Sequence, residues 1–475
     1  MARIVKSKRR DNKLCRAPRV RLGVADGRVT PRAGLHLVAK LNQLLGISAA
    51  IDAAGSPIKS RRRGLGVGSL MLALAEMMLA GGDFFCDLDT QRKDAAGARL
   101  RAVAAIPASS TAIGLGKRFD DSTRQAVERA NAELVGSAFA MVSRKRRQEL
   151  RAQRPTIDLD PTDVEVYGKN KNGSAYNYQG QRTYRPHPAV WAETGWCLAG
   201  DLGSGRDDPR PQAPSLIARA VSALPGGLLR AIVRGDSGFF DAAVAWASLA
   251  NGADFAIAAK RNSAVWRAER AIPKDAWVPA KDMEAEVAEC DYVPAGWPPG
   301  TRTICRRVKV NADDLSSDTR SRRRRTIDAE QLRLLELGEA DFAYAYSFIV
   351  CNLQGDIVKI EAWFRRRALV EEKIKDSKLG LALRHMPSGY EAVNAMWMWA
   401  ALIGLNISSW LQALTGHDLT GGRAHGKRLR RELICVPARV TSHAGDIVVH
   451  AGAEDTDGAF GLAWECLDSL LAAGP

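Results

Sequence analysis

The sequence predicts an α/β protein: an N-terminal all-α region, then a mixed sheet flanked by helices, with a β-rich insertion inside the sheet region. Three observations support this class. Apolar residues recur at helical spacing over 34–154, strand-like and helix-like segments alternate over 155–261, and the alternation lapses over 262–341. With 475 residues, 46% of them apolar and 26% charged, the chain can bury the cores of several domains.

The N-terminal region, residues 1–154, is predicted to be helical. Leu35, Val38, Leu41 and Leu45 fall on one helical face. A turn with hydroxyl caps is expected at 107–111, followed by a segment that reaches Phe119, which is the arrangement of a helix-turn-helix unit. An ordinary helical hairpin explains the same pattern equally well.

The first part of the sheet region, residues 155–261, alternates strands and helices. Polar and apolar residues alternate over 156–160, as in a strand, and 191–202 supplies one or two more strands after a loop. Helices are predicted at 215–224 and 240–249, and strands at 228–233 and 254–259. This alternation indicates a mixed sheet with helices packed on it.

The insertion is assigned to 262–341, with a strand-like piece at 301–310, and residues 342–422 complete the sheet region. That last range begins with a strand at 342–352 and contains an apolar segment, 392–414. Polar residues such as Asn394 and Asn406 interrupt this segment, so we expect a buried helix and no membrane span. Residues 423–475 form a C-terminal tail without a clear motif.

Charge and cysteine usage restrict the functional class. The chain has 69 Lys and Arg against 53 Asp and Glu, a net charge of +16, which is typical of a protein that binds polyanions such as DNA, RNA or anionic lipid. The eight cysteines form no CxxC pair and stand near no histidine, so neither a zinc site nor a disulfide framework is indicated. The basic N-terminus lacks the apolar stretch of a secretory signal, and we expect a cytoplasmic protein.

Acidic residues stand at the ends of two predicted strands. Asp160 closes the first strand, and Asp236 follows the strand predicted at 228–233. Strand-end acids can converge at one edge of a sheet, and a third acid from a neighbouring helix would complete a metal pocket. Asp158 and Asp163 compete with Asp160, and any one of these residues alone would ordinarily be a turn or cap residue.

A third acid stands on a predicted helix between basic residues. Phe364, Arg367, Glu371 and Lys378 are three, four and seven residues apart, which places them along one stripe of a helix. A carboxylate there can bind a hard metal ion while Arg and Lys hold the phosphates on which the metal acts. A nucleic-acid backbone is the natural substrate.

Together these segments resemble the DDE transposases of bacterial insertion sequences, in particular the DDE domain group 1. The resemblance covers about 34–414 and is carried by three segments: Asp160-Pro161-Thr162, Arg234 to Phe239, and the helix of the third acid. That helix matches the family's Tyr-Arg-Glu-Lys signature in spacing, with Phe364 where the family has Tyr. Phe keeps the ring but loses the hydroxyl, and a lost phosphate hydrogen bond costs on the order of 1 kcal/mol.

The resemblance implies an RNase H-like catalytic domain, interrupted by the insertion, that uses two Mg²⁺ ions, with Mn²⁺ as a substitute. It implies that the catalytic and metal-binding residues are Asp160, Asp236 and Glu371. Phosphates would be held by Arg367 and Lys378, with Arg365 and Arg366 compensating for the missing hydroxyl of Phe364. Trp363 is a candidate platform for a flipped base, although an aromatic residue at such a position is more often part of a core.

The implied function is a transposase that binds the terminal inverted repeats of its element through the N-terminal region and the insertion. It would cut the double-stranded DNA and join it to a target, as a homodimer on paired ends. Two other classes remain open: a nuclease or resolvase of the same architecture that cleaves without strand transfer, and a catalytically inactive, transposase-derived DNA-binding protein.

Overall fold

The computed structural model describes residues 21–54, 65–315, 318, 321, 323–367, 380–419 and 425–474. Helices fill the described chain before the sheet, except for a two-residue strand, β1 (Val29–Thr30). Two of these helices have an N-cap side chain. The Asp120 carboxylate accepts a hydrogen bond from the Thr123 N–H, and the Ser143 hydroxyl accepts one from the Arg146 N–H. The helices are α1 (Leu35–Leu45), α2 (Ile47–Ala54), α3 (Val67–Leu79), α4 (Cys86–Arg92), α5 (Ser109–Gly116), α6 (Asp121–Met141) and α7 (Arg144–Ala152).

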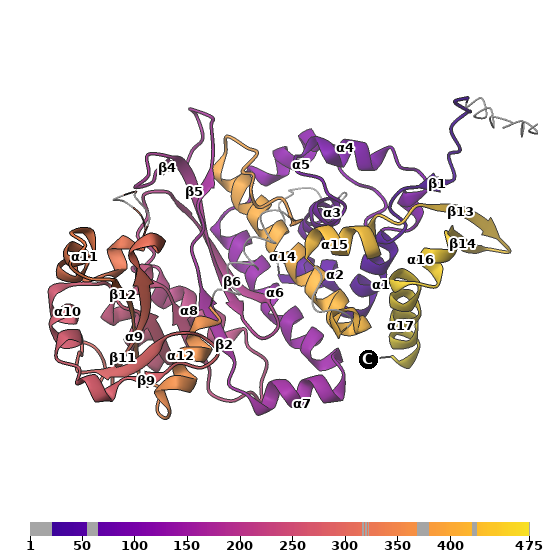
Figure 1. The fold of residues 1–475 in the computed structure, drawn as a ribbon. Helices are drawn as coiled ribbons and strands as arrows, with labels where there is room; N and C mark the ends of the chain where they lie inside the picture. The colour runs from indigo at the N-terminus through magenta and orange to yellow at the C-terminus, as the bar shows by residue number, and fades with distance from the viewer. Residues whose placement is uncertain are drawn as a thin grey trace, which may run out of the picture.

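A mixed sheet of eleven strands, formed by described residues between 156 and 351, lies beside the N-terminal helices, in the left part of Figure 1. Its order is β3-β5-β2-β7-β8-β12-β11-β10-β9, with β4 and β6 also paired to β5. The β2–β7 and β7–β8 pairs are parallel and the others antiparallel. The strands are β2 (Thr156–Leu159), β3 (Val164–Glu165), β4 (Ala175–Tyr176), β5 (Arg182–Trp191), β6 (Trp196–Ser204), β7 (Ile232–Gly235), β8 (Asp254–Ala258), β9 (Val278–Pro279), β10 (Glu286–Cys290), β11 (Arg302–Asn311) and β12 (Phe342–Cys351).

The insertion extends the sheet. Its strands β9–β11 join the core through β12, which pairs with β11 over ten residues and with β8 over three. The segment is less purely β than predicted, because it also forms the helices α10 (Ser263–Arg270) and α11 (Ala329–Glu336). Both helices begin with a capping side chain, Asn262 and Asp328 respectively.

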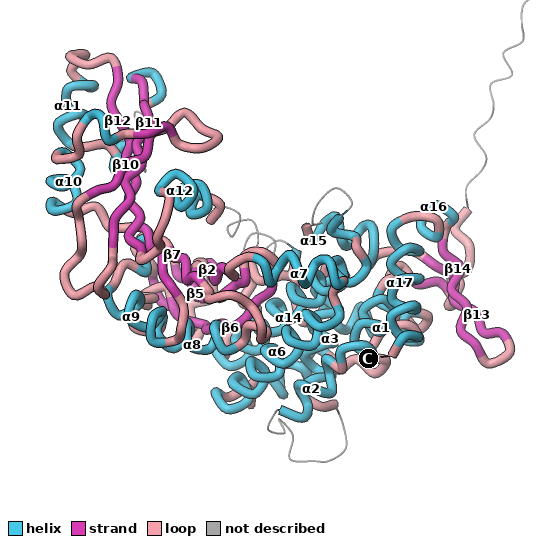
Figure 2. Tube along the Cα trace, turned by 90° about the horizontal axis from the view of Figure 1, so that it is seen from below, coloured by secondary structure: helices cyan, strands magenta, loops and turns pink. Residues whose placement is uncertain are grey.

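Helices cover both faces of the sheet (Figure 2). Two of them, α8 (Ala213–Ser222) and α9 (Ala242–Ala250), pack on one face, where Leu216, Val233 and Phe255 share the main core. On the other face α12 (Ile357–Arg365) covers a separate small core. The short parallel strands therefore lie between helices on both sides, as burial of parallel strands requires.

The helix α14 (Glu391–Thr415) is the central buried helix, as predicted for 392–414. It contacts α3 and β6, and Trp397, Trp399 and Trp410 on it are fully buried. The amide of Asn406 is also buried and is fully used: it accepts from the Cys197 N–H at 2.7 Å and donates to Asn131 at 2.8 Å. Within the described residues, no single helix is long and apolar enough to cross a membrane.

Residues 425–474, in the range expected to be a tail without a motif, form regular structure against the N-terminal helices. Strands β13 (Ala438–His443) and β14 (Asp446–Ala451) form a hairpin that pairs with β1. The helix α17 (Ala459–Ala473) packs on α1, where Lys40 pairs with Asp468 at 2.5 Å. Two short helices, α15 (Gly426–Leu429) and α16 (Ala453–Thr456), complete this part.

Two strand predictions need correction. Residues 182–191 form the long strand β5, most of which the sequence placed in a loop, because Pro186 and Pro188 are unusual inside a sheet. The strand expected at 228–233 is β7 at Ile232–Gly235, because a turn at Gly227, whose φ is +78°, is followed by irregular chain up to Ala231. The shift places Asp236 directly after the strand.

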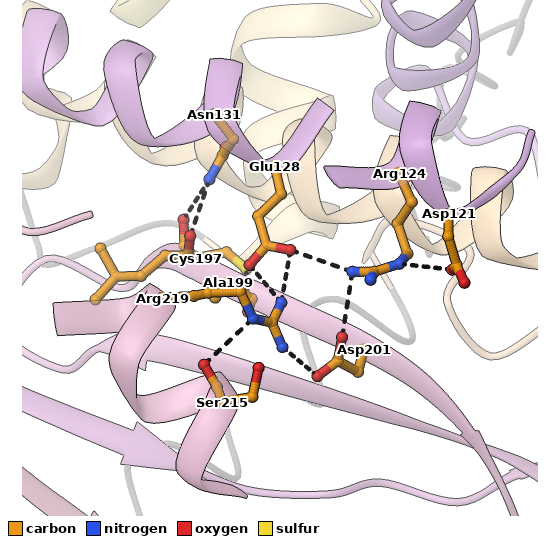
Figure 3. Close-up of polar contacts among 10 residues, drawn as sticks. Asp121, Arg124, Glu128, Asn131, Cys197, Ala199, Asp201, Ser215 and Arg219 are labelled. Carbon is orange, nitrogen blue, oxygen red and sulfur yellow. Dashed lines mark hydrogen bonds and ion pairs between the residues drawn. The ribbon is translucent and has the colours of Figure 1, made fainter. Parts of the chain in front are cut away.

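An ion cluster fixes the longest N-terminal helix to the sheet (Figure 3). The Glu128 carboxylate on α6 accepts from Arg219 of α8 at 2.6 Å and from Arg124 at 3.3 Å. Both arginines also pair with Asp201 in the middle of β6. Burial is the main cause that raises the pKa of Glu128.

The division of the chain at residue 154 into separate domains stays a prediction.

Candidate active site

The two predicted strand-end acids lie side by side. β2 and β7 are neighbouring parallel strands whose last paired residues are Leu159 and Gly235, so Asp160 and Asp236 are the next residue on each strand. The carboxyl ends of parallel strands meet at one sheet edge, which is where loops can present functional groups. Asp236 is held in place by a short turn, because its Oδ1 accepts from the Gly238 N–H at 2.8 Å.

The Arg367 guanidinium approaches both acids. Its Nη2 donates to Oδ1 of Asp160 at 2.9 Å and lies 4.0 Å from Oδ2 of Asp236. Asp160 is 16% exposed and Asp236 is 38% exposed, so the second carboxylate in particular is open to solvent. One cation thus stands between two carboxylates whose charges would otherwise repel each other.

The structure shows that Asp158 and Asp160 have different surroundings. Asp158 is fully buried and accepts two hydrogen bonds from the Arg234 guanidinium, at 2.6 and 2.8 Å. Burial raises its pKa, although the pairing with Arg234 partly offsets that effect. Arg234 also donates to the Trp363 carbonyl at 2.7 Å. The buried pair therefore connects the strand to α12, and Asp160 is the acid that lies beside Asp236.

Only part of the expected helical stripe lies in the described residues. The helix α12 ends at Arg365, so the expectation that Phe364 and Arg367 share one continuous helix is wrong. The chain turns there, and the Arg367 N–H donates to the Phe364 carbonyl at 2.9 Å. This turn is what brings the Arg367 side chain to the strand ends. Glu371 and Lys378 lie outside the described residues.

The other predicted DNA-contacting residues have different surroundings. Phe364 packs on the small core beneath α12. The Trp363 ring lies 4.9 Å from the Arg234 guanidinium carbon, and its Nε1 donates to Thr156 at 3.2 Å. Arg365 donates to the Lys281 carbonyl at 2.6 Å and so contacts the insertion, whereas Arg366 is exposed. Their roles in DNA binding stay predictions.

The chemistry of the donor set fits a hard divalent ion. Two carboxylates converge on one cationic nitrogen, and carboxylate oxygens are the ligands that Mg²⁺ prefers. Within the described part of the chain, no group of three His, Cys, Asp or Glu side chains could hold a metal. The third acid that the sequence predicts, Glu371, is beyond that part.

A family model decides the wider assignment. The model of the transposase DDE domain group 1 matches residues 12–456, nearly the whole chain. The chain belongs to this transposase family. Membership places it among DNA-cleaving and DNA-transferring enzymes, and the match is wider than the 34–414 of the sequence resemblance.

Comparisons with individual proteins give weaker matches than the family model does. No curated protein matches the sequence at a significant level. A solved structure, the cryo-EM structure of a piggyBac transposase synaptic complex with hairpin DNA, is 10% identical with a TM-score of 0.42, and the match covers 85% of this chain and 79% of that one. The assignment to the transposase family rests on the family model.

The sequence did not predict one further part of this transposase, a framework around Arg185. Arg185 donates to Asp163 at 2.7 and 3.2 Å and to the Asp207 carbonyl at 2.8 Å. Asp163 in turn accepts from Asn177 at 3.0 Å. The framework therefore fixes the segment after Asp160 to two other loops. Asp163 stood out in the sequence only as a competitor of Asp160, because the partners come from distant segments.

Proposed function

We propose that this protein is a transposase that binds the terminal inverted repeats of an insertion sequence and catalyses cut-and-paste transposition. In this proposal the sheet is an RNase H-like catalytic domain. The observation that supports it most directly is the pair Asp160 and Asp236, which follow adjacent parallel strands and share the Arg367 guanidinium. Acids at neighbouring strand ends are suited to metal-dependent phosphoryl transfer.

The proposed metal ligands are Asp160, Asp236 and Glu371. Their carboxylates would hold two Mg²⁺ ions, or Mn²⁺ in their place, which would supply activation of the attacking hydroxyl and charge stabilisation at the leaving oxygen. Arg367 orients Asp160 through its 2.9 Å hydrogen bond and reduces the repulsion between the two acids. Arg366, exposed just after α12, and Lys378 bind backbone phosphates.

The proposed partner is double-stranded DNA, at the inverted repeats and at the target. A net charge of +16 supports binding of a polyanion. Two ends must be brought together before they are joined, so we propose a homodimer in the DNA complex. The proposed location is the bacterial cytoplasm, where the chromosome is the substrate.

The test is cleavage of labelled duplexes that carry the DNA flanking the gene, with Mg²⁺ or with EDTA. The intact protein is compared with Glu371→Gln and Asp236→Asn. Asp241→Asn is the matched control, since Asp241 is equally exposed at 38% and caps α9, a role that Asn can also fill. We expect metal-dependent cutting and joining by the intact protein and the control, and binding without cutting by the other two variants.

Two results would contradict the proposal and indicate the alternatives. Cutting that is never followed by joining, even with a target duplex present, would indicate an RNase H-like nuclease. Binding without cutting by the intact protein would indicate a catalytically inactive, transposase-derived DNA-binding protein.

A further inference from the structure

An open pocket of about 670 Å³ lies beside Asp236. Gly238, whose N–H donates to the Asp236 carboxylate, forms part of its wall. The hairpin formed by β4 and β5, which carries Tyr176 and Tyr178, also lines it. The pocket therefore extends from the candidate catalytic edge of the sheet to the tip of this hairpin.

The two tyrosines are unusually exposed. Tyr178 is 87% exposed and Tyr176 is 67% exposed. Most large aromatic side chains of a folded protein are substantially buried, and exposed groups of them commonly mark binding sites. Both residues line the pocket.

The hairpin that carries them is rigidly built. The buried Asn177 side chain accepts from the Gln179 and Gln181 N–H groups at 3.0 and 2.9 Å, which closes the turn around Gly180, whose φ is +77°. The same side chain donates to Asp163, part of the framework of Arg185. The exposed rings are thus fixed relative to the segment that carries Asp160, and a ligand would not have to order them.

Positive charge lies at the same pocket. Arg206 and Lys260 are exposed on its wall, and no hydrogen bond or ion pair with a described residue engages either side chain. The acids of the pocket are engaged locally: Asp207 accepts from the Ser204 N–H and hydroxyl, and Asp208 pairs with Arg210. The hydrogen bond from Arg210 is the main cause that lowers the pKa of Asp208, and the charge of Lys260 contributes to the same shift. Since neither Arg206 nor Lys260 forms a hydrogen bond with a described residue, both can still reach an anionic ligand.

We propose that this pocket binds an unpaired stretch of the DNA strand next to the cleaved phosphate, with bases stacked on Tyr176 and Tyr178 and phosphates on Arg206 and Lys260. Exposed aromatic faces beside free cations are the combination that single-stranded nucleic acid requires, because every base has a stacking face and every link a phosphate. A duplex offers no free base faces to the rings. The inference rests on the proposed function, since it assigns a substrate strand to that active site.

The test measures binding of a fluorescent oligothymidylate by the full-length protein in EDTA, where no cleavage occurs. Stacking of one base is worth about 1–3 kcal/mol, so Tyr178→Ala should weaken binding roughly 5- to 150-fold, whereas Tyr178→Phe, which keeps the ring, should bind nearly as the intact protein does. The matched control is Tyr167→Ala, because Tyr167 is 86% exposed but does not line the pocket. Replacing both Arg206 and Lys260 by Gln should reduce the salt dependence, by about 0.7 in logarithmic slope for each cation.

The inference is overturned if Tyr178→Ala binds as tightly as the intact protein, or if Tyr167→Ala weakens binding equally. Failure of the proposed function is a separate result. In that case the intact protein would not cut duplex DNA with Mg²⁺, while the Tyr178-dependent binding of oligothymidylate would persist. A protein that cuts duplex DNA but shows no Tyr178 dependence would keep the function and lose the inference.

Discussion

Among the clusters of carboxylates and arginines in the described residues, two differ in where their acids stand. In the ion cluster of Figure 3, Glu128 is on a helix and Asp201 is in the middle of a strand, and both face Arg219 between packed elements. In the candidate active site, Asp160 and Asp236 come directly after their strands and face Arg367 at an open edge. The same residue types therefore serve packing in one place and stand at an open edge of the sheet in the other.

Asp158 shows that position matters more than residue type. It stands two residues before Asp160, yet it is fully buried and paired with Arg234. An acid within a strand between two helical layers has to be neutralised by a partner, since an unpaired buried charge is strongly destabilising. An acid just past the strand end can stay partly hydrated and remain available to a metal ion.

The largest difference between the clusters should come from Asp236→Asn. We expect cleavage of an element-end duplex to fall about a thousandfold or more, because a metal ligand is lost. The free energy of unfolding should change by less than about 0.5 kcal/mol, since the side chain is 38% exposed. Cleavage assays and urea unfolding measure the two effects, and a large loss of stability with retained cleavage would reverse the comparison.

Glu128→Gln should have the opposite profile. It removes charged hydrogen bonds to Arg219 and Arg124 in a site where Glu128 is 8% exposed. Because burial of the charge, which raises the Glu128 pKa, offsets part of that loss, we expect the free energy of unfolding to fall by about 2 kcal/mol. Cleavage per folded molecule should be unchanged. Asp121→Asn is the control in urea unfolding, because Asp121 pairs with the same Arg124 but is 90% exposed. Equal stability of the two variants would show that the cluster does not stabilise the fold.

His187 lies opposite Asp201 in the sheet. Its burial should make the free energy of unfolding depend on pH in the acid range. Burial lowers its pKa from an ordinary 6.5 to about 4. Between these values the unfolded chain binds a proton that the folded chain does not, so stability should fall as pH falls, by up to about 1.4 kcal/mol per pH unit. His187→Gln should remove this slope in urea unfolding measured at pH 6.5 and below, and an unchanged slope would assign it to other groups.

The smallest effect is expected for Phe364→Tyr, which restores the hydroxyl of the family signature. If the ring edge faces a phosphate, one hydrogen bond of about 1 kcal/mol should tighten binding of the element-end duplex about fivefold. The duplex affinity in EDTA measures the change. Weaker binding, or a loss of stability, would show that Phe364 serves only the small core under α12.

Much of the fold could be predicted from the sequence, because the spacing of apolar residues indicates which face of a helix or strand is buried. Helical spacing of leucines gave the N-terminal helices, and the apolar segment 392–414 became α14 with its three buried tryptophans. The pattern failed at β5, where Pro186 and Pro188 stand inside a paired strand, four and two residues before a register shift that leaves Leu198 of the neighbouring β6 without a partner in β5. Local residue types did not show that neighbouring strands could accommodate them.

At the candidate site, the strand-end positions of Asp160 and Asp236 followed from the sequence. The placement of Arg367 required the turn after α12, which helical spacing does not predict. The role of Asp158 depended on a partner 76 residues away, Arg234. The Arg185 framework likewise joins segments that meet only in the folded chain.

The shared hydrogen bonds between the insertion and the core sheet have a mechanical consequence. β12 pairs with β11 along ten residues, and its last three residues also pair with β8 on the other side. β8 in turn neighbours β7, the strand directly before Asp236. Rotating the insertion away from the core would break these backbone hydrogen bonds. The strand pairing therefore fixes the orientation of the insertion relative to the core sheet. In the proposed complex, DNA that contacts both the insertion and the candidate site would therefore have to follow a fixed distance between them.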